Sequence, residues 1–191
     1  MREASIHRQT AETDITLTLN LDGGGHNICT GIGFFDHMLT ALAVHGGLDL
    51  RVEARGDLEV DCHHTVEDVG IVLGQALGRA LADKTGLRRY GHAFIPMDEA
   101  LAFCAVDLSG RPFLVFSGEF PQAQVGNFDA CMTQEFFRAV AFHAGITLHL
   151  RCEYGANSHH MIEGMFKAFA HALKDAAESA GTGVLSSKGM L

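Results

Sequence analysis

The sequence predicts an α+β fold of duplicated ββαβα half-domains, in which sheets with helices packed on one face form a two-layer sandwich. Three observations predict this class. HHTVED at residues 63–68 recurs 96 positions later as HHMIEG at 159–164. Each copy begins a long stretch of apolar residues at helical spacing, and strand-like segments precede both copies in the same order. We therefore expect a single domain built of two pseudo-repeats, about 1–92 and 93–191.

Alternating side chains and glycines define the elements of the first half. Residues 13–22 alternate apolar and polar side chains like a strand, and a short strand near 26–30 follows three glycines, so we expect a hairpin. A helix over 34–45 ends at a pair of glycines, a strand covers 48–54, and a helix over 63–84 ends before a further glycine. These elements give the order ββαβα.

The second half repeats this order. We expect strands over 100–107 and 113–116, a helix from about 129 to 144, a strand over 146–153 and a helix over 159–179. The two halves therefore match element for element, which supports an internal duplication.

Length and composition indicate a folded globular chain. The 191 residues are 47% hydrophobic and 19% charged, which is enough for a sizeable core. No apolar run reaches the roughly 18 to 20 residues of a membrane span, and the first residues lack the apolar core of a signal peptide. We therefore expect a cytoplasmic protein that has no membrane partner.

The cysteine pattern and the charge exclude further classes. The five cysteines stand alone without a CxxC pair, which argues against a zinc ribbon, a redox motif or a disulfide framework. The net charge is −9 and the chain has no basic tract, so the electrostatic footprint of a nucleic-acid-binding protein is missing. We therefore expect no nucleic-acid partner.

The two HHxxE motifs predict a pair of metal ions. On a helix, residues three and four apart share a face, so His63 and His64 can each chelate together with Glu67. Adjacent histidines diverge by roughly 100° around the helix axis, so the two members of each pair serve two different ions more easily than one. The second motif repeats this spacing with His159, His160 and Glu163. A dinuclear centre is the natural interpretation.

The first helix of each half adds one more candidate ligand. When the segment 45–47 is aligned with 143–145, His37 falls on Glu135. Eight groups divided between two ions give four each, which leaves two open positions on an octahedral ion, as a catalytic metal requires. A donor set without thiolate suits manganese, iron or zinc, and its three carboxylates favour manganese. Because one chain is not expected to bring all eight groups together, a site shared between subunits would solve the geometry.

Further side chains indicate an anionic ligand. Those that would suit a phosphate monoester beside two cations are Arg89, Arg111, Lys167, Ser187 and Lys188. Two simpler interpretations stay open. Lys167 lies four residues after Glu163 and can form a salt bridge with it, and the C-terminal SSKG segment can be an unstructured end.

Several segments together resemble one known family. They are RQTAET at 8–13, FFDHML at 34–39, DCHHTVED, PMDEAL at 96–101, DLSGRP, NSHHMIEGMFKAFAHAL and SSKG. In this order, and over nearly the whole chain, they are similar to imidazoleglycerol-phosphate dehydratase of histidine biosynthesis. The resemblance implies a manganese lyase that acts on a phosphorylated imidazole small molecule. It also implies a homo-oligomer, a 24-mer assembled from trimers, with intersubunit active sites.

The resemblance implies roles for individual residues. The metal ligands would be His37, His63, His64, Glu67, Glu135, His159, His160 and Glu163. The substrate-binding residues would be Glu12, His37, His45, His63, Glu67, Arg89, Arg111, His159, Lys167, Ser187 and Lys188. The catalytic residues would be Glu12, His45, Glu67 and Glu163. Some family members have histidine where this chain has Glu135, and a carboxylate can replace that imidazole on manganese.

The implied reaction dehydrates D-erythro-imidazole glycerol phosphate to imidazole acetol phosphate. The hydrogen that is lost is not acidic, because no carbonyl group is adjacent, so the imidazole ring must take up the electrons. Two manganese ions (Mn2+) per active site would stabilise the ring as an imidazolate. The ring would then expel the neighbouring hydroxyl and give a diazafulvene-like intermediate. We expect Glu12 and His45 to perform the acid–base work.

Two other functions compete with this interpretation. A dinuclear phosphatase or amidohydrolase would use similar ligands and a similar phosphate clamp, but it would release inorganic phosphate or hydrolyse its substrate. A metal-assembled structural shell would use the ions only to join subunits, with closed coordination spheres and no affinity for imidazole compounds. The spacing of the ligands alone favours neither a hydrolase nor a lyase.

Overall fold

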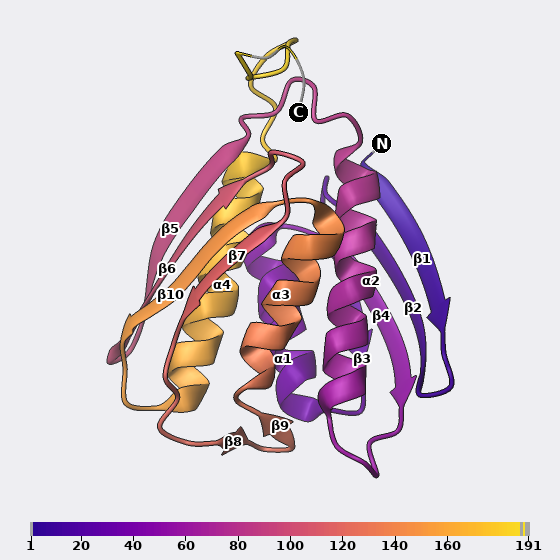
Figure 1. Cartoon of the computed structure of the whole chain (residues 1–191), viewed down its shortest axis with the longest axis vertical. Helices are drawn as coiled ribbons and strands as arrows, with labels where there is room; N and C mark the ends of the chain where they lie inside the picture. The colour runs from indigo at the N-terminus through magenta and orange to yellow at the C-terminus, as the bar shows by residue number, and fades with distance from the viewer. Residues whose placement is uncertain (1, 188, 190–191) are drawn as a thin grey trace.

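The computed structural model describes residues 2–187 and 189, which form two four-stranded sheets with four helices between them (Figure 1). The first half contains β1 (Glu3–Gln9), β2 (Thr13–Asn20), β3 (His26–Cys29), α1 (Gly33–Gly46), β4 (Asp49–Gly56) and α2 (His63–Leu81). The second half contains β5 (Tyr90–Met97), β6 (Ala100–Asp107), β7 (Phe113–Ser117), α3 (Met132–Ala144), β10 (Thr147–Tyr154) and α4 (Ser158–Ala176). Two short strands, β8 (Gln124–Val125) and β9 (Phe128–Asp129), pair just before α3.

Both sheets have the same topology. The strand order is β1-β2-β4-β3 in the first sheet and β5-β6-β10-β7 in the second. In each sheet the first three strands are antiparallel neighbours, and the fourth strand pairs in parallel with the third. The shared order confirms the predicted α+β class with duplicated half-domains and helices on one face of each sheet.

The predicted hairpin between residues 13–22 and 26–30 is wrong. The short strand β3 lies parallel to β4, with Ile28 opposite Val52. It cannot pair with β2, because β1 and β4 already occupy both edges of that strand. The glycines after β2, two of which have positive φ, instead carry the chain across to the free edge of β4.

Each half also begins with one strand more than the predicted ββαβα order. The added strands are β1 and β5, which form an outer edge of their sheets. In β1 only Ile6 is buried, and in β5 only Gly91 is buried. Edge strands with so few buried side chains lack the alternation of apolar residues by which a strand is recognised in a sequence.

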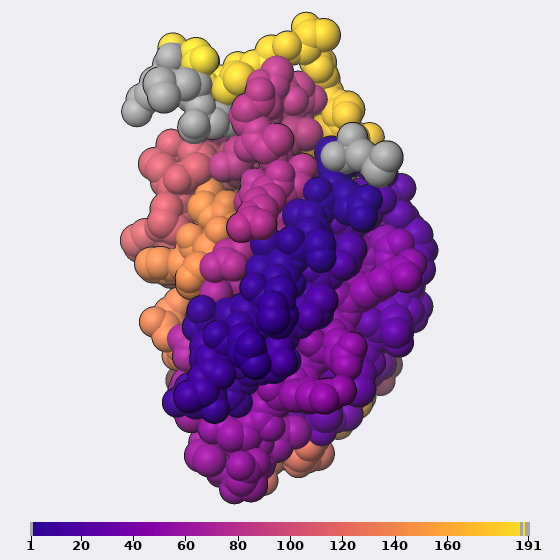
Figure 2. All heavy atoms as spheres, turned by 90° about the vertical axis from the view of Figure 1, so that its right-hand side faces the viewer, coloured from indigo at the N-terminus to yellow at the C-terminus, as the bar shows by residue number. Residues whose placement is uncertain are grey.

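The helices and the inner faces of the sheets enclose the core. Alternate residues of β2, namely Ile15, Leu17 and Leu19, are fully buried, and β2 packs against α2. The residues between them point outward and are polar. Figure 2 shows this outer side of the first sheet, with the N-terminal strands running across it. One buried and one polar face per strand explains why β2 was predicted correctly.

The helices pair across the two halves. In the centre of the molecule α1 packs against α4, and α2 packs against α3 (Figure 1). The second pair is close at Gly70 and Gly74, where an added Cβ would lie 2.9 Å from the Phe136 carbonyl oxygen and 2.8 Å from that of Val140. This cross-pairing brings ligands from different halves together. None of the described helices combines the length and the apolar character of a membrane span.

β5 approaches α4 closely at Gly91, so we predict that Gly91→Ala destabilises the protein. The added Cβ would lie 1.9 Å from the carbonyl oxygen of Ala172, a backbone atom that cannot rotate away. We expect the free energy of unfolding, measured in urea, to fall by at least about 2 kcal/mol. Gly25→Ala is the control, since its Cβ would meet no atom within 4 Å and should change stability by less than about 0.5 kcal/mol. Equal stability of the two variants would contradict this packing.

Candidate active site

Both HHxxE motifs lie at the beginning of a helix, where an Asp or Asn side chain holds the first histidine. The Asp61 carboxylate accepts a hydrogen bond from the backbone N–H of His63 at 2.7 Å. The Asn157 side chain accepts one from the N–H of His159 at 2.9 Å. Such acceptors satisfy the free backbone donors of the first turn. The first histidine therefore has the same place in α2 and in α4.

His37 from α1 meets His159 and Glu163 from α4, and we call these three residues the α1/α4 triad. Nε2 of His37 lies 3.5 Å from Oε2 of Glu163, and Nε2 of His159 lies 3.2 Å from the same oxygen. Three ligand atoms, one from each residue, lie within 4.8 Å of one another. Across residues 2–187 and 189, no other group of three or more His, Cys, Asp or Glu side chains has this compactness.

The carboxylate of Glu163 is the most buried ligand of the α1/α4 triad. Its side chain is 8% exposed, and Oε1 lies 2.7 Å from Nζ of Lys167. Burial acts to raise the pKa of Glu163, but the hydrogen bond and charge of Lys167, with His37 and His159, lower it overall. The carboxylate is therefore charged and ready to bind a cation. Lys167 therefore forms the i, i+4 salt bridge with Glu163, which was the simpler of the two interpretations of this residue in the sequence.

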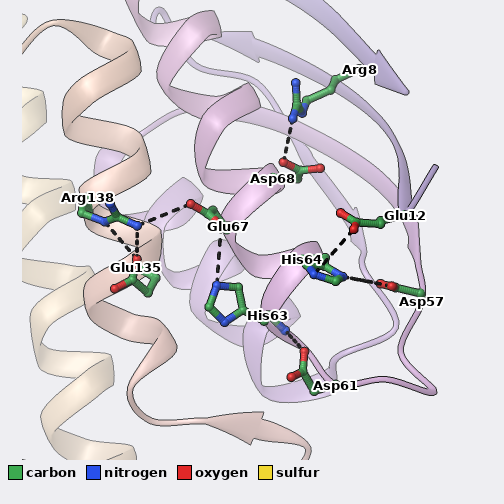
Figure 3. A network of polar contacts seen from close by, with 10 residues as sticks. All are labelled: Arg8, Glu12, Asp57, Asp61, His63, His64, Glu67, Asp68, Glu135 and Arg138. Atoms are coloured by element: carbon green, nitrogen blue, oxygen red, sulfur yellow. Dashed lines mark hydrogen bonds and ion pairs between the residues drawn. The ribbon is translucent and has the colours of Figure 1, made fainter. Parts of the chain in front are cut away.

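A pseudo-equivalent group lies where α2 meets α3 (Figure 3), and we call His63, Glu67 and Glu135 the α2/α3 triad. Nε2 of His63 lies 3.5 Å from Oε2 of Glu67. The guanidinium of Arg138 donates a hydrogen bond to Glu135 and lies 3.5 Å from Oε1 of Glu67. A cationic group therefore already joins the two carboxylates. Glu135 occupies the place in this triad that His37 has in the other, as the alignment predicted.

The second histidine of each motif points elsewhere and is held by an acidic side chain. Nδ1 of His64 lies 2.9 Å from Asp57, and Nδ1 of His160 lies 2.7 Å from Glu99. Figure 3 shows His64 turned toward Asp57 and Glu12, whereas Glu67 points toward Arg138. These hydrogen bonds raise the pKa of both histidines and lower the pKa of Glu99 to about 2.

The eight predicted ligands therefore occupy separate places in one chain. Two triads lie between paired helices, while His64 and His160 lie outside them with their own acidic partners. The histidines of each motif diverge around the helix, as their adjacency predicted. A single described chain thus supplies one compact group of candidate metal ligands, the α1/α4 triad, together with a looser pseudo-equivalent group and two additional imidazoles.

Two of the predicted phosphate-binding residues, Arg89 and Arg111, meet at Asp107, whereas Lys167 pairs with Glu163. The buried Arg89 donates to Asp107 from Nε at 2.7 Å and also donates to the carbonyl oxygen of Leu185. Nη2 of Arg111 lies 3.5 Å from the same carboxylate. The bond to Leu185 brings the C-terminal segment with the exposed Ser187 toward these arginines, whereas the predicted residue Lys188 lies outside the described residues.

The two predicted acid–base residues lie apart in one chain. Glu12 is in the turn between β1 and β2, and its carboxylate lies 3.8 Å from Nε2 of His64. His45 is in the last turn of α1, and its Nδ1 lies 3.3 Å from Nε2 of His171. Each is therefore associated with a different part of the ligand set.

The family model of imidazoleglycerol-phosphate dehydratase matches residues 30–173, which include both HHxxE motifs. The chain belongs to this family. Imidazoleglycerol-phosphate dehydratases of Acetivibrio thermocellus and Bacillus cereus are 59% and 57% identical over 193 and 194 residues. These alignments cover 100% of this chain and 99% and 100% of the relatives.

Solved structures of imidazoleglycerol-phosphate dehydratase agree with this assignment. The Staphylococcus aureus enzyme has a TM-score of 0.86 at 42% identity, over 93% of this chain and 99% of that chain. The Pyrococcus furiosus enzyme, solved in complex with (S)-C348, also has a TM-score of 0.86, at 38% identity, over 97% of this chain and 100% of that chain. The resemblance seen in the motifs is confirmed, and the chain is a hydro-lyase of histidine biosynthesis that acts on a small molecule.

Four residues that contact the candidate ligands or His45 were not predicted from the sequence. Asp57 and Glu99 hold the second histidines, Arg138 joins the carboxylates of the α2/α3 triad, and His171 contacts His45. Asp57 lies 7 residues before its histidine, whereas Glu99 lies 61 residues before its own. No common spacing could therefore have revealed these partners, although Glu99 belongs to the PMDEAL segment that supported the resemblance.

The pair of Glu99 and His160 predicts a pH-dependent contribution to the stability of the metal-free protein. The pKa of Glu99 is about 2, below its ordinary 4.5, so its stabilising effect is complete above pH 4.5 and is lost as pH falls. The pKa of His160 is raised above 6.5, so its effect is complete below pH 6.5 and is lost as pH rises. Between pH 4.5 and pH 6.5 both stabilising effects are therefore present.

We therefore expect Glu99→Gln to lower the urea midpoint most between about pH 4.5 and 6.5, because glutamine keeps an acceptor but loses the charge. The measurement is a series of urea unfolding curves on chelator-treated protein. Glu119→Gln, at another exposed glutamate, is the control and should leave the pH profile of the wild type unchanged. A Glu99→Gln midpoint that differs from the wild type equally at every pH would contradict the assignment.

Proposed function

We propose that this dehydratase is metal-dependent and binds two manganese ions in each active site. It converts D-erythro-imidazole glycerol phosphate to imidazole acetol phosphate. The observation that carries this proposal is the α1/α4 triad, in which His37, His159 and Glu163 converge from two helices that belong to different halves. Candidate ligands repeated at equivalent positions of two helix pairs are what a two-ion centre requires.

The chemistry of the donors fits a divalent transition metal. All eight side chains offer imidazole nitrogen or carboxylate oxygen, and none offers thiolate. Asp57 and Glu99 bond Nδ1 of His64 and His160, which leaves Nε2 of each ring as the ligand atom. In the α2/α3 triad, Glu67 and Glu135 would be available to hold an ion only after the half-exposed Arg138 has released their carboxylates.

Each active site is completed by more than one copy of the chain. Half-exposed side chains in both triads support this, since His37 is 50% exposed and His63 is 47% exposed. Within residues 2–187 and 189, no further imidazole, thiol or carboxylate joins the three groups of the α1/α4 triad, and His64 and His160 lie outside both triads. A second copy that brings these two histidines to the triads would give the ions their remaining ligands. The family likeness suggests that the assembly is a homo-oligomer of 24 subunits.

The chain's own residues orient the substrate and move its protons. When bound, the ions supply positive charge that lowers the N–H pKa of an imidazole ring. Arg89, Arg111, Lys167, Ser187 and Lys188 hold the phosphate and thereby fix the ring relative to Glu12 and His45. The hydroxyl beside the ring would take a proton from one acid–base residue and leave as water, giving a diazafulvene-like species. The other residue would then take the adjacent C–H proton, and the resulting enol would tautomerise to the ketone.

Glu12 and His45 are the acid–base residues in this scheme. Glu12 lies near His64 in the same chain. When His64 of one copy completes a triad of another copy, Glu12 would therefore come within reach of the reacting carbons of the substrate. Glu67 and Glu163 would contribute indirectly, by holding the ions that stabilise the imidazole ring of the substrate. The enzyme works in the cytoplasm, where its five free cysteines would stay reduced.

The reaction itself is tested by measuring both possible products. We expect manganese-loaded protein to convert imidazole glycerol phosphate to the ketone without releasing inorganic phosphate. Treatment with a chelator should abolish the activity, and added manganese should restore it. Release of phosphate would instead support the dinuclear hydrolase. Absence of both products, with the metal shown to be bound, would support the structural shell.

The role of Glu12 is tested by Glu12→Gln. Because the amide cannot accept or release a proton, we expect turnover to fall by about 10²-fold or more, while the metal content stays that of the wild type. Glu3→Gln, at an exposed position of β1, is the control and should keep normal turnover. Near-normal turnover of Glu12→Gln would remove this residue from the mechanism.

A further inference from the structure

A pair of histidines joins α1 to α4 next to the α1/α4 triad. Nδ1 of His45 lies 3.3 Å from Nε2 of His171, and the ring centroids are 5.4 Å apart. His171 lies one turn after Lys167 and two turns after Glu163 on α4. The bond engages one nitrogen of His45 and leaves its Nε2 for a ligand.

The internal duplication supplies a comparison for this pair. The position equivalent to His45 is His143 on α3, and the positions equivalent to Lys167 and His171 are Ile71 and Gln75 on α2. Nδ1 of His143 faces the carbonyl oxygen of Ala139 in its own helix, at 2.9 Å. The two triads thus repeat the positions of their candidate ligands on paired helices, but the pair of imidazoles accompanies only the α1/α4 triad.

The surroundings keep His45 neutral before the reaction. Burial lowers the pKa of His45, and the nearby charges of Lys167 and His171 lower it further, while Glu163 opposes them. Lys167 is itself fixed by its 2.7 Å salt bridge to Glu163. A neutral imidazole can either accept or donate a proton at Nε2, depending on which nitrogen carries the hydrogen.

We propose that His171 is a positioning residue, which holds His45 in one tautomer with Nε2 facing the substrate, so that acid–base chemistry takes place only beside the α1/α4 triad. This inference rests on the proposed role of His45. Only one of the two facing nitrogens carries a proton, so the bond couples the tautomers of the two rings. When His45 gains a proton at Nε2, its Nδ1–H donates to His171, and the bond is kept through the reaction.

The test compares His171→Leu with Gln75→Leu, the same replacement at the equivalent place of α2. We expect His171→Leu to lower kcat by about 10- to 100-fold, with KM changed by less than about threefold because the phosphate contacts stay. His171→Gln keeps an amide that can bond Nδ1 of His45, so kcat should recover to within about fivefold of the wild type. Gln75→Leu should keep kcat within about twofold of the wild type.

A second comparison separates this role from a structural one. His171→Leu should lower kcat much less in a His45→Ala background than in the wild type, because it acts through His45. Metal content and urea midpoints are measured for every variant. A His171→Leu enzyme that is as active as Gln75→Leu would overturn the proposal, as would an equal loss of kcat in the His45→Ala background. A normal kcat in His45→Ala would also overturn it, and only that result would remove His45 from the proposed mechanism.

Discussion

The cross-pairing of helices between the two halves determines where the ligands meet. Because α1 packs against α4 and α2 packs against α3, each triad takes one residue from one half and two from the other. Neither half could form a triad by itself. The small residues Gly70 and Gly74 allow the backbone of α2 to approach α3, and the loss of this contact would separate Glu67 from Glu135. The metal-binding geometry is therefore a consequence of the packing of the core.

The adjacency of two histidines has the opposite effect, since it distributes ligands outward. One histidine of each motif joins a triad, and the other points about 100° away around the helix, where Asp57 or Glu99 fixes its ring. The same short motif thus presents donors in two directions. In the proposed assembly, a second copy of the chain brings the donors that complete these sites.

The sequence predicted those features that depend on local spacing. The face shared by His63 and Glu67, and the strands with one buried face such as β2, follow from helix and strand periodicity. The edge strand β1 was missed because Ile6 is its only buried residue. Glu99 and His171 were missed as partners because tertiary packing alone brings them to their contacts. Arg138 lies three residues after Glu135, but it reaches Glu67 only because α3 packs on α2. Whether the ligands of one site come from one chain could not be read from spacing, since spacing describes only a single helix.

In the proposed assembly, each ion is bound by residues of more than one copy. A crystal structure of the manganese-loaded assembly, with the ions located by their anomalous scattering, tests it most directly. We expect each ion to contact a triad of one copy and the Nε2 atom of His64 or His160 of a neighbouring copy. Ions whose protein ligands all come from one chain would contradict the account.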